Sequence, residues 1–268
     1  MASFSVVSNI SSANAQANLS NTQIGLNKAL NRLSSGFRIN YAGDDAAGLA
    51  VANSYRNDIA VINQGVRNAN DGLSGLQIKD GALNNISTLL DRLATLATQA
   101  SSTSNGADIS KLSDEYTTLL TEIDRESTVA GLDQDSSFSV FISAEATLSN
   151  GAVSGSFDGV NVAGLGLTTT AFTDATDAQG RLAEITAAID VLGDVQNSVG
   201  TLENRLTYAI SLATSQVVNK KAAESRIRDA NIAEESANLT RYNILSQSGI
   251  AALAQANSTS ASVLALLR

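Results

Sequence analysis

Residues 59–97 read IAVINQGVRNANDGLSGLQIKDGALNNISTLLDRLATLA, and the spacing of aliphatic residues in this stretch decides the fold. Apolar side chains recur at alternating steps of three and four residues, which is typical of helices that pack along a coiled-coil seam. Three other stretches carry the same spacing, at 19–37, 109–123 and 185–217. The sequence therefore predicts a mainly α protein, built as a long, discontinuous coiled-coil bundle from both ends of the chain.

In the last of these stretches, every seventh residue from Ile185 is apolar, and most of the residues four positions after these are apolar as well. The predicted seam consists of Ile185, Ile189, Leu192, Val199, Leu206, Ile210, Ala213 and Val217, with Gln196 and Glu203 as polar positions. Stripes of this kind most often form core. They predict a helical bundle and not a cofactor site.

The composition agrees with long helices and excludes most enzyme classes. The 268 residues include no Pro, Cys, His or Trp, and aromatic residues make up only 4%. Helices that meet along aliphatic seams do not need the large aromatic anchors of a compact core. Without Cys and His there is no disulfide, no thiolate or imidazole metal site and no Ser-His or Cys-His nucleophile pair. A net charge of −9 argues against nucleic-acid binding, which needs clustered Lys and Arg.

Both ends of the chain lack charge. Residues 1–27 and 242–267 contain no charged side chain but many Asn, Gln and Ser residues. These polar residues interrupt the run of about 20 apolar residues that a membrane span requires, and no basic segment marks a secretory signal. A helix of this kind is not stable alone, so we expect the two ends to pair with each other or with other copies. Two frayed terminal helices are the alternative.

The middle of the chain has a different character. Residues 126–180 contain seven acidic residues and no Lys or Arg. Short alternating runs at 138–142 and 160–162 predict strands. We therefore expect a small antiparallel β element inserted between the long helices, with its acidic surface exposed to solvent.

Two segments resemble ligand-binding motifs, and both fail on inspection. The run that begins at Asp133 opens like a calcium loop, but Phe138 replaces the turn glycine and Ala144 replaces the bidentate Glu. The Gly164-Leu-Gly166 run lacks the third glycine of a nucleotide-binding loop. We therefore predict no catalytic, cofactor-binding or metal-binding residues, and no enzyme activity.

Several motifs at both ends of the chain resemble those of bacterial flagellin. They lie at 26–36 (LNKALNRLSSG), 44–50 (DDAAGLA), 224–229 (ESRIRD), 253–257 (LAQAN) and 263–268 (VLALLR). The resemblance covers about four fifths of the chain, roughly residues 1–128 and 180–268. The short middle segment implies a short form that lacks the large outer domains of longer flagellins.

The resemblance implies a structural subunit that is exported unfolded by the flagellar type III apparatus and assembles into the extracellular filament used for swimming. The implied partners are many copies of the chain itself, the flagellar cap and junction proteins, and an export chaperone at the C-terminal helix. The hook–filament junction protein of the same family is the runner-up interpretation. An enzyme carried on a flagellin scaffold, or a binding module with an outer β segment, belongs to other classes.

The resemblance also implies a division of the chain into paired parts. Residues 1–43 and 222–268 would form paired inner-tube helices, 44–130 would pair with 176–221 in a central domain, and 131–175 would form a small β-rich outer segment. The residues expected in the terminal assembly seam are Leu26, Leu30, Leu33, Leu253, Val263 and Leu267.

Recognition by the innate flagellin receptor of animals is a further implication. The family's contact stretch matches at Leu90, Arg92, Leu96 and Glu115, with Ile185 opposite. Strong agonists carry an Arg-Glu pair where this chain has Ala94-Thr95. The alternative is that these residues pack against neighbouring subunits.

Overall fold

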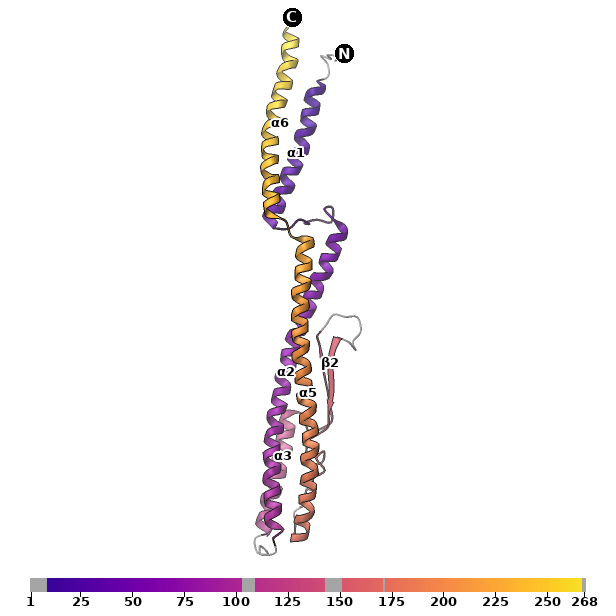
Figure 1. The fold of residues 1–268 in the computed structure, drawn as a ribbon, viewed down its shortest axis with the longest axis vertical. Helices are drawn as coiled ribbons and strands as arrows, with labels where there is room; N and C mark the ends of the chain where they lie inside the picture. The colour runs from indigo at the N-terminus through magenta and orange to yellow at the C-terminus, as the bar shows by residue number, and fades with distance from the viewer. Residues whose placement is uncertain (1–8, 103–108, 143–150, 171, 267–268) are drawn as a thin grey trace. The chain divides into compact units, whose positions relative to one another are not determined.

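The computed structural model describes residues 9–102, 109–142, 151–170 and 172–266, and within them it contains five helices and two strands (Figure 1). In chain order these are α1 (Ile10–Ser35), α2 (Ala46–Ala100), α3 (Ile109–Ala130), β1 (Ser136–Phe141), β2 (Ala152–Phe157), α5 (Ala175–Arg228) and α6 (Ile232–Leu266). The mainly α fold with a small antiparallel β element in the middle is confirmed. In the described part of the chain, no helix has the length and apolar character of a transmembrane span.

The chain divides into two compact units. The terminal unit consists of residues 1–57 and 220–268, and the central unit consists of residues 58–219. Two long helices, α2 and α5, contribute residues to both units.

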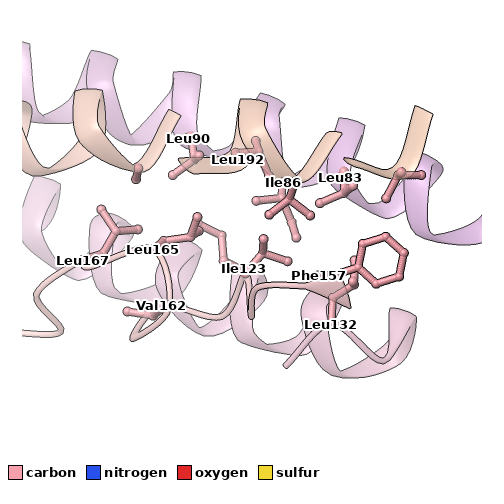
Figure 2. Packing of buried hydrophobic residues seen from close by; sticks show 14 of the residues in the cluster. Leu83, Ile86, Leu90, Ile123, Leu132, Phe157, Val162, Leu165, Leu167 and Leu192 are labelled. Carbon is pink, nitrogen blue, oxygen red and sulfur yellow. The ribbon is translucent and has the colours of Figure 1, made fainter. Parts of the chain in front are cut away.

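The central unit has an aliphatic core built by α2, α3, α5 and the segment that follows β2 (Figure 2). Leu83, Ile86 and Leu90 of α2 point toward Ile123 of α3 and Leu192 of α5, and all five side chains are buried. Val162, Leu165 and Leu167, from the segment that follows β2, pack against the same cluster. The predicted seams at 59–97 and 109–123 therefore supply much of this core.

The seam on α5 is shifted to one side of its predicted course. Its buried residues are Ile185, Ala188, Leu192, Val195, Val199, Leu202, Leu206 and Ala213. The predicted residues at steps of seven from Ile185 are all buried. Ile189, which was also predicted for the seam, is 39% exposed, and Ala188 is buried in its place. The buried side also carries Leu202, which lies against the hairpin, since a Cβ at Gly155 of β2 would lie 2.7 Å from Leu202 Cδ1.

The two strands pair antiparallel, with Ser136 opposite Phe157 and Phe141 opposite Ala152. The strand predicted at 138–142 lies almost entirely within β1. The strand predicted at 160–162 is wrong, because this short segment bonds to α3 and the residues after it. The N–H of Val160 donates to the Leu132 carbonyl at 2.8 Å, and the N–H of Val162 donates to Asp124 Oδ1 at 2.8 Å.

In the terminal unit, α1 ends at Ser35 and is capped by Gly36, whose φ of +75° is readily adopted by glycine. The following segment pairs with the end of α5. The N–H of Arg38 donates to the Arg228 carbonyl at 2.6 Å, and the N–H of Ala230 donates to the Gly36 carbonyl at 2.9 Å. These bonds anchor the connections on either side of the α1–α6 pair.

Candidate assembly surface

Polar contacts set the register between α1 and α6, which lie antiparallel within the terminal unit (Figure 1). Near one end of the pair, Asn9 Nδ2 donates to the Ala256 carbonyl at 2.9 Å. Near the other end, Arg32 Nη1 lies 2.9 Å from Glu235 Oε1, and these side chains are only 21% and 9% exposed. A slip of one residue would break both contacts, so the register is well defined.

Small residues allow the two helices to approach closely between these ends. A Cβ at Gly25 of α1 would lie 2.6 Å from the ring of Tyr242, and a Cβ at Gly249 of α6 would lie 3.2 Å from Leu19 Cδ1. The ring of Tyr242 and the side chain of Leu19 therefore occupy the space that a larger residue would need.

The terminal unit nevertheless buries few apolar side chains completely. Its fully buried apolar residues, among those described, are Ala29, Ile39 and Ala52. Nine large apolar side chains of the unit are between 44% and 67% exposed: Ile10, Ile24, Leu30, Tyr41, Val51, Ile232, Ile244, Leu245 and Ile250. Fully burying one such side chain typically contributes about 1.5–3 kcal/mol, so this surface has a large capacity for association.

The residues predicted for the terminal seam differ in their burial. Leu26, Leu33 and Leu253 are half-buried, whereas Leu30 is 51% exposed. Val263 and Leu267 lie outside the residues whose side chains the structure describes. The role of these residues in assembly stays a prediction.

A turn after α1 folds back against the helix. Asp44 Oδ1 lies 2.8 Å from Lys28 Nζ, while Asp44 Oδ2 accepts hydrogen bonds from the N–H groups of Asn40 and Tyr41. The Lys28 contact, together with the backbone bonds, lowers the pKa of Asp44 despite its partial burial. The turn is therefore held by a charge-assisted contact that persists below the usual pKa of an aspartate.

Sequence reasoning missed the roles of Lys28, Arg32, Asp44 and Glu235. One signal was present, because Lys28 and Arg32 are the first two charged residues of the chain and are separated by four positions. That spacing places them on neighbouring turns of one helix. The partners themselves come from distant parts of the sequence, so only the fold could identify them.

Comparison with known proteins identifies the family. Residues 6–140 match the model of the bacterial flagellin N-terminal helical region, and residues 182–267 match that of the C-terminal helical region. The chain belongs to the flagellin family. It is 36% identical to a flagellin of Halalkalibacterium halodurans and 32% identical to one of Bacillus subtilis. Each alignment covers 97% of this chain and 98% of the relative.

Two further comparisons extend the range of relatives. Flagellin FlaB1 of Treponema pallidum is 31% identical over 97% of this chain and 98% of its own length. The crystal structure of Bacillus cereus flagellin is 29% identical, covering 59% of this chain and 94% of that one, with a TM-score of 0.47. The family matches and these relatives show that the present chain is a subunit of the bacterial flagellar filament. They give no specific support to the junction-protein alternative.

The family is one of structural proteins. Within residues 9–102, 109–142, 151–170 and 172–266, no group of three or more acidic side chains is placed to hold a metal ion. Flagellins assemble with copies of themselves into an extracellular filament.

The residues matched to the family's receptor contact differ in their exposure to solvent. Leu90, Leu96 and Ile185 have no exposed surface and belong to the core of the central unit. Arg92 and Glu115 are exposed, and Arg92 Nε donates to Glu115 Oε1 at 2.9 Å across α2 and α3. In this conformation only the ion pair presents side chains to a partner.

A carboxyl group of the central unit is held in an unfavourable position. Glu203 Oε1 is buried and finds no hydrogen-bond partner among the described residues. Burial raises the pKa of Glu203, and the charge of Asp80 on α2 raises it further. The ionised carboxylate therefore destabilises the folded central unit at neutral pH.

The Glu203→Gln variant is expected to be more stable than the parent chain at pH 7, by less than about 1 kcal/mol for a partly exposed charge. The sign follows from the raised pKa, because the folded state binds the proton more tightly than the unfolded state and loses this advantage as pH rises. The gain should shrink as pH falls through the raised pKa of Glu203 and disappear well below about 4.3, where Glu is protonated in both states. Urea unfolding at pH 7 and at a pH well below about 4.3 measures the gain in the free energy of unfolding. An equal gain at the two pH values would contradict the destabilising role assigned to the ionised Glu203.

Proposed function

We propose that the terminal unit carries the main contacts between subunits when this flagellin polymerises. The observation that supports the proposal is the mismatch between its buried and exposed apolar surface. Nine large apolar side chains are exposed on a unit that fully buries only Ala29, Ile39 and Ala52 among its described apolar residues. Because burial of exposed apolar side chains favours association, contact with other copies would complete this core.

The proposed layout follows the five parts expected from the sequence. Residues 1–43 and 222–268 form the inner tube, residues 44–130 and 176–221 form the surrounding layer, and residues 131–175 face outward. The charge distribution supports this order, since residues 126–180 hold seven acidic and no basic side chains while the chain ends are uncharged. Charge is readily hydrated at an outer surface and costly to bury between subunits.

We further propose export as an unfolded chain and secretion to the growing tip. The absence of Pro and Cys suits this route, because refolding at the tip then needs no proline isomerisation and risks no thiol oxidation. An export chaperone would cover the apolar face of α6, where Ile244, Leu245 and Ile250 are exposed. The cap and junction proteins would contact the same terminal unit at the two ends of the filament.

Replacing Leu30 with Asp tests the proposal. The side chain is 51% exposed, so the lone chain should tolerate the charge, whereas burial of that charge between copies should prevent growth. Electron microscopy and sedimentation should show long tubes from the parent chain and none from Leu30→Asp. Short rings from the parent chain would instead favour a junction protein.

The control is Val129→Asp, which places the same charge on an exposed apolar position of α3 in the central unit. It should grow far better than Leu30→Asp. An equal loss of filament growth in the two variants would show that any added charge blocks growth. It would overturn the assignment of the main subunit contacts to the terminal unit. Circular dichroism confirms that both variants keep their helices.

A second proposal is that the Arg92–Glu115 pair contacts the innate flagellin receptor of animals. It is supported by the exposure of both side chains and by their match to the family's contact stretch. Arg92→Ala should lower the signal of a receptor reporter assay about tenfold, as expected for the loss of one charged interface contact. Arg125→Ala removes a comparable exposed ion pair of α3 and should leave the signal unchanged. Equal signals from parent and Arg92→Ala chains would exclude this contact.

A further inference from the structure

A cavity of about 290 Å³ opens on the surface of the terminal unit, between α1 and the turn at 40–44. It is lined in part by Ile24, Asn27 and Asn31 of α1 and by Asn40 and Tyr41 of the turn. A Cβ at Gly25 of α1 would lie 2.6 Å from the ring of Tyr242 of α6, so at 3.6 residues per turn Asn27, two residues later, lies on the opposite side of α1. The cavity is therefore on the face of α1 that α6 leaves free.

The walls of the cavity are held in place by bonds within the chain. Lys28 pairs with Asp44 at 2.8 Å and Asn40 Nδ2 donates to Ser35 Oγ at 2.8 Å. Such contacts allow the cavity to exist before any partner arrives. Preformed sites of this kind bind with a smaller loss of conformational entropy.

The lining selects a neutral occupant. The charges at the cavity are already compensated, because Lys28 pairs with Asp44 and Arg32 pairs with Glu235. The remaining lining offers side-chain amides together with two apolar residues, Ile24 and Tyr41, which are 64% and 67% exposed. An uncharged helix face that combines an aliphatic side chain with amides and hydroxyls would complement it.

The outer face of α6 has this chemistry. Tyr242 packs against Gly25 of α1, so Ile244, two residues later, lies on the opposite side of α6. Ile244 is 58% exposed, and Gln247 and Ser248 are exposed beside it. No residue from 242 to 267 carries a charge.

We propose that the cavity of one subunit receives Ile244 and the neighbouring residues of α6 from a second copy of this chain. The inference rests on the proposed function and identifies the two surfaces that meet. The aliphatic side chain of Ile244 would pack against Ile24 and Tyr41, while Gln247 would bond with the amides of α1.

The positions of the two surfaces explain open-ended growth. The cavity lies on the free side of α1 and Ile244 lies on the free side of α6, so each subunit offers one surface of each kind in opposite directions. A contact between two different surfaces is heterologous, and repeating it generates a ring or a helical filament instead of a closed pair.

Disulfide trapping between two chains tests the contact directly, because the parent sequence contains no Cys. One chain carries Asn31→Cys, and the other carries Gln247→Cys and a tag that alters its mass. The chains are mixed, polymerised and oxidised, and the products are separated without reductant. We expect a mixed dimer as the main crosslinked product. The pair Asn27→Cys and Ser248→Cys gives the same readout if a cysteine at Asn31 prevents growth.

The control replaces Gln247→Cys with Ser246→Cys, one residue away on α6 and on its half-buried side toward α1. The mixed dimer should be at least ten times more abundant with Gln247→Cys. Filaments that form without this difference, for both cysteine pairs, would overturn the inference and leave the filament function intact. Failure of the parent chain to form filaments would instead contradict the proposed role of the terminal unit.

Discussion

Arg32→Ala is expected to raise the critical concentration for filament growth about 100-fold. The substitution leaves Glu235 nearly buried, with a side chain 9% exposed and without its cationic partner. Removing one member of a buried ion pair typically costs about 3–5 kcal/mol, and we expect the lower end because Arg32 is 21% exposed. About 3 kcal/mol per subunit corresponds to a change of roughly two orders of magnitude in an association constant. Sedimentation of filaments against free subunit measures it.

A double-mutant cycle separates the ion pair from the loss of charge alone. Arg32→Ala combined with Glu235→Ala should be less harmful than the sum of the single variants, because neither charge is then left alone. Arg241→Ala removes an exposed cation from α6 and should have little effect. If it impairs growth as strongly as Arg32→Ala, net charge and not the pair is responsible.

Gly65→Ala should destabilise the central unit by about 1–3 kcal/mol, the usual cost of overpacking. A Cβ at this position of α2 would overlap the carbonyl group of Ile142, which follows β1. The backbone of Ile142 is tied to Gly151 by a hydrogen bond of 2.8 Å, so the end of the hairpin where β1 leaves and β2 begins must move to make room. Urea unfolding of the full chain, followed by circular dichroism, measures the loss.

Gly75→Ala provides the matched control on the same helix. A Cβ there would meet no atom within 4 Å, so the substitution gains helix propensity without a clash. Stability should rise by up to about 1 kcal/mol. If Gly65→Ala gives the same rise, the hairpin does not lie against α2 as the structure has it.

Much of the fold could be predicted because it depends on local pattern. The alternation of three and four along residues 59–97 and 109–123 located helices, and the run at 138–142 located β1. The buried side of α5 could also have been predicted, because Val195 and Leu202 are apolar one position before the polar Gln196 and Glu203 of the predicted seam. What the linear pattern does not show is that the hairpin covers Leu202, because that contact joins residues distant in the sequence.

The candidate assembly surface shows the same division. The lack of charge at both chain ends, visible in the sequence, already indicated helices that depend on partners. The ion pair between Arg32 and Glu235 and the cavity beside Lys28 and Asp44 could not be predicted, because each brings together side chains from different elements.

By itself, the sequence determined that this protein is a flagellin of long helices with uncharged ends, because periodicity, composition and family motifs are properties of the chain in order. Only the tertiary structure decided which faces of α1 and α6 remain open and which polar groups set their register. Those features depend on the packing of residues more than 200 positions apart, and a linear pattern does not specify which distant side chains meet.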